Sequence, residues 1–143
     1  MKKTRRTSSQ ERKRLVKKLD ILFSEYIRLR DKRAYGGCFF CGKPIQHVFH
    51  VITRSKRAVR WDDRNGLGSC AGCNLRFEHD TVFIFNVQKK YIETFGQVAF
   101  DDLMRLGSSP ARHSLDDLRA IKKKLEDNYA GICVAHDLFG RKA

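Results

Sequence analysis

The sequence lacks any long apolar segment. No run among its 143 residues approaches the roughly 20 residues that a membrane-spanning helix needs. The basic N-terminal stretch MKKTRRTSSQERKR is not followed by an apolar segment, so we expect no secretory signal and a cytoplasmic protein. No internal repeat or long low-complexity segment is evident either, apart from a duplicated cysteine pair. The chain length then predicts one domain with a modest core.

Negative charge is also scarce. The chain has 16 Asp and Glu against 30 Lys and Arg, which gives a net charge of +14, and 13 of the basic residues lie within residues 1–33. Such an excess indicates a polyanionic partner, and it favours a nucleic acid over a membrane surface.

Four of the five cysteines form two C-x2-C pairs, and these carry the clearest signal in the sequence. Cys38 with Cys41, and Cys70 with Cys73, supply the four thiolates that a tetrahedral Zn²⁺ needs. In the cytoplasm this pairing favours zinc over disulfides. A zinc ion held by four thiolates has no open position, so its expected role is to pin two loops together. Cys133 has no partner at this spacing and is expected to be a half-buried apolar residue.

The expected fold class is α+β, a small zinc-stabilised domain in four consecutive parts. We expect a basic tail that is disordered when alone over residues 1–9, a basic amphipathic helix over 10–35, a zinc-bound core over 36–96, and a helical region over 97–143. The helix has an apolar stripe made of Leu15, Leu19, Leu22, Tyr26 and Leu29. This stripe either packs on the zinc core or pairs with a second copy to form a homodimer.

Within the core, the pattern predicts a strand, a loop, a second extended segment and a helix. Apolar residues around His50 indicate a short strand, residues 54–60 a basic loop, and residues 61–67 a second extended or looped segment. The second cysteine pair leads into a helix. Further helices are expected from Asp80 or Thr81 to Phe95, from Gln97 to Leu106, and from a Ser114 and Asp117 capping box to about Tyr129.

The residues between and beside the cysteine pairs suit phosphodiester hydrolysis. That reaction needs a base for water and a hard cation for the charge on the phosphate. His50 on its strand can serve as the base, and Asn74 at the start of its helix offers a carbonyl oxygen to Mg²⁺ or Mn²⁺. A strand–loop–strand–helix unit that joins such residues is the plan of the ββα-metal, or HNH, nucleases.

Three runs resemble the core of the NinG family, also called Rap: HVITRS from His50, RWDDRN from Arg60, and CAGCN from Cys70. The resemblance covers roughly residues 15–130. It implies a phage recombination protein in the host cytoplasm, acting as a nuclease on branched DNA such as Holliday junctions and D-loops. The core is also similar to that of endonuclease VII-type resolvases. This implies His50 as general base and Asn74 as a ligand of the catalytic Mg²⁺ or Mn²⁺.

One position departs from the HNH pattern. Many HNH enzymes place a metal-binding Asp or His directly before the base, where this chain has Phe49. His47 lies three residues before His50 and is either a second ligand of the catalytic metal or a surface histidine. Asn65 falls at the middle position of the motif. It is expected to hold the loop or to orient His50, or else to form an ordinary Asn-Gly turn.

The remaining candidates are mostly cations expected to bind phosphates of DNA. Arg54 is placed beside the catalytic groups as a phosphate clamp, because a guanidinium binds phosphate oxygens bidentately. The full expected DNA-binding set is Arg54, Arg57, Arg60, Arg12, Lys13, Arg14, Lys17, Lys18, Arg28 and Arg30. His79 and Asp80 either approach the metal or belong to a cap or loop, and His113 and His136 are expected to be structural or on the surface.

Two other classes of function fit part of the same pattern. A non-catalytic zinc protein that binds DNA as a recombination accessory factor or regulator would share the charge and the cysteine pairs. An RNA-binding zinc protein would also share them, but it would not require His50 and Asn74.

Overall fold

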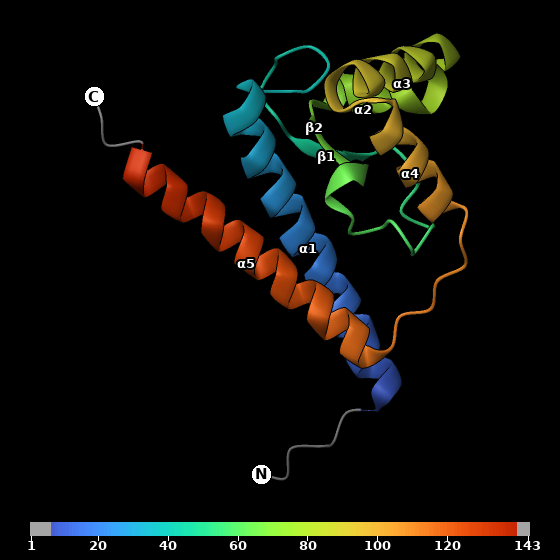
Figure 1. Cartoon of the computed structure of the whole chain (residues 1–143), viewed down its shortest axis with the longest axis vertical. Coiled ribbons are helices and arrows are strands. Elements are labelled where there is room, and N and C mark those ends of the chain that lie inside the picture. Colours follow the sequence, from blue (N-terminus) through green and yellow to red (C-terminus); the bar gives the residue numbers. More distant parts are fainter. Residues whose placement is uncertain (1–6, 140–143) are drawn as a thin grey trace. The chain divides into compact units, whose positions relative to one another are not determined.

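The structure is a computed structural model that describes residues 7–139, with side chains described as far as residue 135. No helix within this described range is long and apolar enough to cross a membrane. The elements in chain order (Figure 1) are α1 (Ser8–Tyr35), β1 (His47–His50), the 3-10 turn η1 (Asp63–Asn65), β2 (Gly66–Ser69), α2 (Ala71–His79), α3 (Thr81–Phe95), α4 (Gln97–Gly107) and α5 (Leu115–Phe139).

The chain forms two compact units, and helix α1 contributes residues to both. The first unit combines the chain up to Phe23 with the segment from His113 onward, and the second comprises Ser24–Arg112. Five α-helices and one two-stranded sheet make up the described part, so the mixed α and β class is present, with helices dominating.

Both helices of the first unit begin with reciprocal side-chain caps. The Gln10 backbone N–H donates to Thr7 Oγ1 at 3.3 Å while the Thr7 N–H donates to Gln10 Oε1 at 3.1 Å. The Asp117 N–H donates to Ser114 Oγ at 3.0 Å, and the Ser114 N–H donates to Asp117 Oδ2 at 2.7 Å. Each pair satisfies two N–H groups that a helix start leaves without partners. The predicted box at Ser114 is confirmed, but α5 continues ten residues beyond the expected end at Tyr129, to Phe139.

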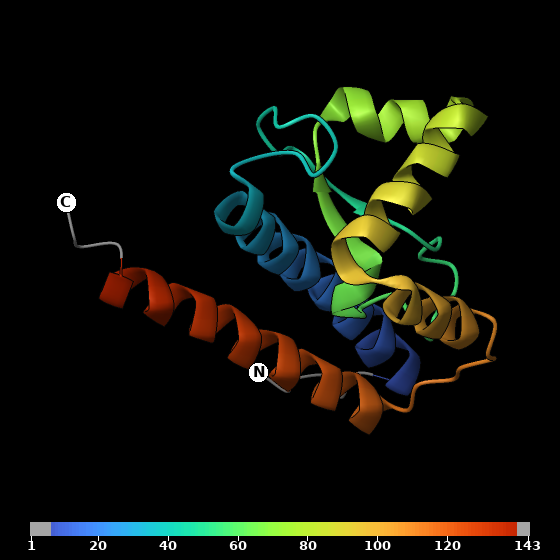
Figure 2. The ribbon, with the colours of Figure 1, turned by 45° about the horizontal axis from the view of Figure 1, so that its top comes forward.

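Residues 8–23 of α1 pair with α5, and the N-terminal ends of the two helices lie together. Arg119 forms an ion pair with Glu11, and Leu19, Leu118 and Leu125 are each at most 2 % exposed. The two helices can be followed side by side in Figures 1 and 2. The first half of the α1 stripe therefore has a partner within the chain, in a helix that the sequence analysis did not consider for this role.

The buried face of α1 differs from the predicted stripe. Leu19 and Tyr26 are buried as expected, but Leu15, Leu22 and Leu29 are only half-buried. The residues with the lowest exposure follow a spacing of four, which keeps to one side of a helix. They are Leu19, Phe23, Ile27 and Asp31, at 0, 2, 0 and 0 % exposed.

In the second unit, β1 and β2 form an antiparallel hairpin. The register places His47 opposite Ser69, Phe49 opposite Leu67, and His50 opposite Gly66. The strand predicted around His50 is confirmed, although it ends at His50 and does not include Val51 and Ile52. The second extended segment is shorter than expected, because it begins only at Gly66 after the 3-10 turn.

The helices that follow the hairpin start and stop close to the predicted residues. Asp80 caps α3, with Oδ1 accepting from the Phe83 N–H at 3.0 Å, and α3 ends at Phe95 before Gly96. Helix α4 runs one residue past the expected Leu106. Figure 2 shows these helices beside the hairpin in a second view. Local capping signals were therefore sufficient to place both helices.

Aromatic rings fill the core between the hairpin and these helices. Phe49 is 2 % exposed, and its ring lies edge-on to Phe77 of α2, with the centroids 4.1 Å apart. Phe40 from the first cysteine loop contacts both Phe49 and Phe83 of α3, at centroid distances of 5.4 and 5.5 Å. Burying aromatic rings of this size supplies a large part of the apolar area that stabilises the fold. The cysteine loop, the strand and both helices thus share one core.

Candidate functional site

The four cysteines predicted to bind zinc lie together. Their Sγ atoms are all within 4.8 Å of one another, and Cys41 Sγ is 3.5 Å from Cys70 Sγ. A tetrahedron with zinc–sulfur bonds of about 2.3 Å has sulfur–sulfur edges of about 3.8 Å. Cys38, Cys70 and Cys73 are buried, and Cys41 is exposed. The donor type, number and spacing all fit a structural Zn²⁺.

Both cysteine loops are shaped for a metal by local backbone geometry. Gly42 has a φ of 77°, a left-handed conformation that favours glycine, and its N–H donates to Cys38 O at 2.9 Å. Cys70 is the N-cap of α2, and its Sγ accepts from the Cys73 N–H at 3.4 Å. This N–H, followed by the neighbouring thiols, lowers the pKa of Cys70 to about 7, against the effect of burial. The lower pKa favours the thiolate, which is the form that binds a metal.

His50 is the last residue of β1 and is half-buried. It lies opposite Gly66, and the next backbone N–H, of Val51, donates to Asn65 O at 3.0 Å. The hairpin therefore continues one hydrogen bond past His50 and fixes the backbone on both sides of this histidine.

Asn65 holds the chain that follows His50. Its side chain is 0 % exposed, with Oδ1 accepting from Ile52 N–H at 2.7 Å and Nδ2 donating to Ile52 O at 2.9 Å and to Val59 O at 3.0 Å. These three bonds close the basic loop at both ends. An ordinary exposed Asn-Gly turn would show neither the burial nor the bonds, so the structure gives Asn65 the loop-holding position.

Helix α2 runs alongside β1 in the same direction. Gln46, just before the strand, accepts through Oε1 from Ala71 N–H at 3.2 Å, and Phe49 contacts Phe77. Asn74 lies between these two contact points along the helix and is half-buried. Because side chains alternate along a strand, His47 projects from the same face of β1 as Phe49, towards α2. His47 is exposed and Asn74 is half-buried, and by this alternation His47 lies on the side of β1 that faces α2.

His50 projects from the other face of β1, since it follows Phe49 directly. His47 and His50 are three residues apart, so they project from opposite faces of β1. The roles expected for His50, Asn74 and His47 at a catalytic metal stay predictions. Phe49 stands at the position where many HNH enzymes have a metal ligand. Its side chain is buried in the core and offers no ligand atom.

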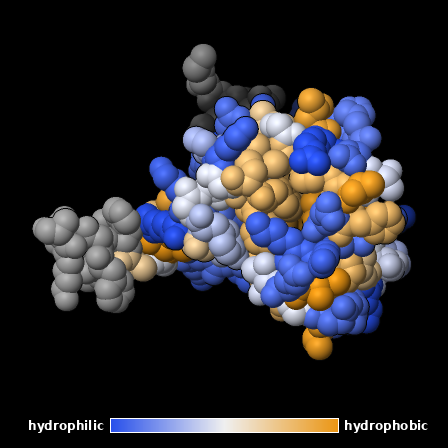
Figure 3. Space-filling view, turned by 90° about the horizontal axis from the view of Figure 1, so that it is seen from above, coloured by the Kyte–Doolittle hydropathy of each residue, from blue (hydrophilic) through white to orange (hydrophobic). Residues whose placement is uncertain are grey.

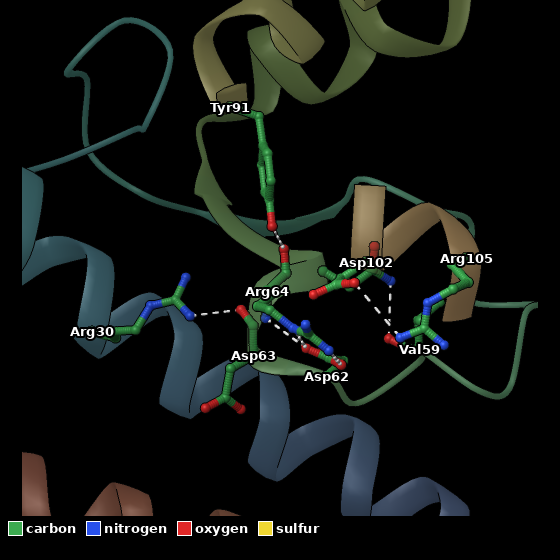
Figure 4. A network of polar contacts seen from close by, with 9 residues as sticks. Arg30, Val59, Asp62, Asp63, Arg64, Tyr91, Asp102 and Arg105 are labelled. Carbon is green, nitrogen blue, oxygen red and sulfur yellow. Dashed lines mark hydrogen bonds and ion pairs between the residues drawn. The ribbon is translucent and has the colours of Figure 1, made fainter. Parts of the chain in front are cut away.

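A polar network that the sequence analysis did not foresee supports the turn before β2 (Figure 4). Arg30 of α1 donates to Asp63 O at 2.8 Å and to Gly66 O at 2.7 Å, and Tyr91 Oη donates to Arg64 O at 2.8 Å. Arg64 in turn pairs with Asp62 at 2.7 Å. Arg30 was expected to contact DNA, but its guanidinium is turned inward and bonded to the protein, so we leave it out of the DNA-binding set.

Asp31, next to Arg30, is a fully buried carboxylate at 0 % exposure. Its Oδ2 accepts from Gly68 N–H at 2.6 Å, and its Oδ1 accepts from Arg30 Nε at 2.7 Å. It therefore ties α1 to the middle of β2. The signal in the sequence for this buried carboxylate is its position, since Asp31 continues the spacing of four set by Leu19, Phe23 and Ile27.

We expect Asp31→Asn to lower the free energy of unfolding by about 2 kcal/mol. The amide keeps one acceptor, but it cannot accept from both Gly68 and Arg30, and one buried donor loses its charge-assisted bond. Urea unfolding of the variant, compared with Asp127→Asn at an exposed position of α5, measures the difference. Equal midpoints for the two variants would contradict this role for Asp31.

The other cations of the predicted DNA-binding set are exposed, except Arg60 and Arg12, which are half-buried. Arg54 and Arg57 are exposed in the loop after β1, whereas Arg60 is half-buried, with its guanidinium 5.4 Å from the Trp61 ring centroid. On α1, Arg12 is half-buried and donates to His113 O. The other α1 cations of the predicted set are exposed, and they are Lys13, Arg14, Lys17, Lys18 and Arg28.

The remaining histidines and the fifth cysteine lie outside the cysteine cluster. His79 is exposed at the end of α2, and Asp80 serves as the α3 cap, where the Phe83 N–H lowers the pKa of its carboxyl group. His113 is half-buried, and Cys133 is half-buried as expected. The side chain of His136 lies outside the described residues. Among the described residues, the four cysteines form the only group of three or more His, Cys, Asp or Glu side chains arranged to hold a metal.

Comparison with known protein families gives a match over most of the chain. The family model described as "Bacteriophage Lambda NinG protein" matches residues 1–131, so the chain belongs to the NinG family. No curated protein and no solved structure matches the chain.

Proposed function

We propose that this NinG family member is a metal-dependent endonuclease that cuts branched DNA in phage recombination, such as Holliday junctions and D-loops. The observation that carries the proposal is the unit formed by β1, β2 and α2, which the four cysteines close at one end. In it, His50 stands at the end of β1, and Asn74 directly follows the last cysteine. We infer a core of the ββα-metal nuclease type from this order of elements and residues.

In the proposed reaction, His50 takes a proton from water, and the water oxygen attacks the phosphorus as the bond to the leaving oxygen breaks. A neutral imidazole suits this task near pH 7. Asn65 positions His50 by fixing Ile52, two residues further along the chain. The zinc site keeps β1 and the start of α2 in register and takes no part in the chemistry.

The catalytic Mg²⁺ or Mn²⁺ would be held by Asn74 and His47. Two protein ligands are compatible with Mg²⁺, which keeps several waters and takes phosphate oxygens from its substrate. When bound, the ion stabilises charge on the phosphate and on the leaving oxygen. Since Phe49 supplies no ligand, we expect the ion to bind firmly only together with DNA.

The DNA backbone is proposed to contact the basic loop and the exposed face of α1. Arg54, Arg57 and Arg60 supply cations within ten residues of His50. The face over α2 and α3 is less suitable, because it exposes Leu75, Val82 and Phe85. Figure 3 shows hydrophobic side chains gathered among hydrophilic ones on the face seen from above. Contacts to phosphates are independent of sequence and weaken strongly with salt.

Nicking of a four-way DNA junction in Mg²⁺ or Mn²⁺ tests the proposal. We expect His50→Ala to lower the cleavage rate by at least about 100-fold, the usual contribution of a general base, with junction affinity unchanged. His79→Ala, an exposed histidine of α2, is the matched control and should cleave normally. The enzyme proposal fails if the native chain cleaves no DNA in either ion.

A non-catalytic DNA-binding protein is the second candidate, and Phe49 is the observation that favours it. An aromatic side chain in the core replaces the usual metal ligand before the base. In that case, the native chain would bind junctions at about 150 mM salt without cutting them, and His50→Ala would change nothing. Preference for a structured RNA over both junction and duplex DNA would contradict both candidates.

A further inference from the structure

We propose that a surface pocket between the basic loop and the end of α4 binds a phosphate of the DNA strand, as a second contact beside the His50 region. The pocket has a volume of about 530 Å³ and is lined by Lys56, Arg57 and Arg112, but by no acidic residue. The site rests on the proposed DNA binding and is independent of cleavage. Arg112 was not among the predicted DNA contacts.

The charge of the lining identifies the ligand class. Three cations converge on the pocket, and neither Lys56 nor Arg112 forms an ion pair among the described residues. Guanidinium groups bind phosphate oxygens bidentately, and an ammonium group adds a point charge. The volume leaves room for the sugar next to the phosphate, which favours a backbone phosphodiester over a small free anion.

The opposite wall is adapted to a negative ligand even though it is a helix C-terminus. The last carbonyls of a helix carry partial negative charge and would repel a phosphate. Here, Ser108 Oγ donates to Met104 O at 2.9 Å, and Ser109 Oγ donates to Arg105 O at 3.2 Å. These two hydroxyl groups cover the carbonyls, and Arg112 brings a cation to the same wall.

The two walls are held against each other by a close approach between Gly107 and Ile52. A Cβ atom on Gly107 would lie 2.6 Å from Ile52 Cδ1, so any larger residue there would displace the end of the Ile52 side chain. Ile52 is bonded through both its N–H and its C=O to Asn65. The pocket is therefore fixed to the same residue that fixes the backbone after His50.

This connection sets how far the phosphate lies from the site of cleavage. Lys56 is six residues after His50, so even a fully extended chain would place their Cα atoms within about 20 Å. At about 3.4 Å of helix rise per nucleotide, that is at most about six nucleotides. The pocket therefore lies within a few nucleotides of the proposed catalytic residues, and we expect it to contact the same DNA arm.

Binding to a four-way junction in EDTA, where no metal supports cleavage, tests the pocket. We expect Lys56→Gln and Arg112→Gln each to raise Kd roughly five-fold near 150 mM salt and to reduce the salt slope by about one. Lys89→Gln removes the same charge from an exposed position of α3 and should change Kd less than about two-fold. All three side chains are exposed, so thermal unfolding should be unchanged.

A neutral methylphosphonate placed at successive positions of one arm locates the contact. At the bound phosphate, the methylphosphonate should weaken DNA binding by the native chain but not by the Arg112→Gln variant, because each change removes the same interaction. Additive effects at every position would overturn the pocket, as would equal effects of Arg112→Gln and Lys89→Gln. A native chain that binds no DNA would instead overturn the proposed function, and the pocket with it.

Discussion

Replacing Cys70 with serine is expected to abolish zinc binding and to unfold the second unit, Ser24–Arg112. Thiolate coordination of a structural zinc contributes on the order of 10 kcal/mol, and this is folding free energy because the unfolded chain has no formed site. A domain of this size is stable by only about 5–15 kcal/mol. Cys70 is also the N-cap residue of α2, so without its thiolate the start of that helix is no longer tied to the metal site. Zinc analysis and circular dichroism on heating measure both losses.

Cys133→Ser is the matched control for this experiment. Cys133 is half-buried in α5 and lies outside the cluster, so its substitution should leave the zinc content and the melting temperature close to those of the native chain. A Cys70→Ser variant that keeps its zinc and melts normally would show that the four sulfur atoms do not form a metal site.

Asn65→Ala is expected to lower the free energy of unfolding by about 4 kcal/mol. The substitution leaves the N–H and the C=O of Ile52 without their partner inside the protein, whereas Val59 O keeps its bond from the Asp62 N–H at 3.1 Å. Each buried polar group left unsatisfied costs about 1–3 kcal/mol. Urea unfolding measures the change, and Asn86→Ala at an exposed position of α3 provides the control. A loss below about 1 kcal/mol would mean that water replaces the side chain.

Asn65→Asp adds a pH dependence to the same test. A carboxylate there would face two carbonyl oxygens in a buried position, so the folded chain would raise its pKa above the unfolded value of about 4. The variant should therefore be most stable at acid pH, relative to the native chain, and should lose stability as the pH rises from about 4 through the folded pKa. A stability difference that does not change between pH 4 and pH 8 would contradict the geometry.

Features encoded by neighbouring residues were predictable from the sequence. The cysteine spacing gave the cluster, and the caps at Asp80 and Ser114 gave the starts of two helices. Each cap, and each cysteine pair taken by itself, is made of residues within four positions of each other, and the repeated C-x2-C spacing indicates that the two pairs share one metal. The end of α5 was missed because the helix continues through Gly131 to Phe139.

Contacts between distant segments were not predictable in the same way. A helical stripe shows that a face is buried but not what covers it, so the pairing of α1 with α5 was missed. The inward turn of Arg30 depends on two backbone carbonyls more than 30 residues away. The position of His47 on the side of β1 that faces α2 likewise follows from the way in which α2 packs on β1, which no local pattern encodes.

The contacts that tie Asp31 and Arg30 to β2 also decide how the sheet can associate. An edge strand normally presents free backbone donors and acceptors, which invite pairing with another chain. On the side of β2 away from β1, Asp31 accepts from the Gly68 N–H, Phe39 N–H donates to Gly68 O at 2.9 Å, and Arg30 donates to Gly66 O. A second molecule therefore finds these groups already bonded, and the two-stranded sheet cannot extend through them into an aggregate.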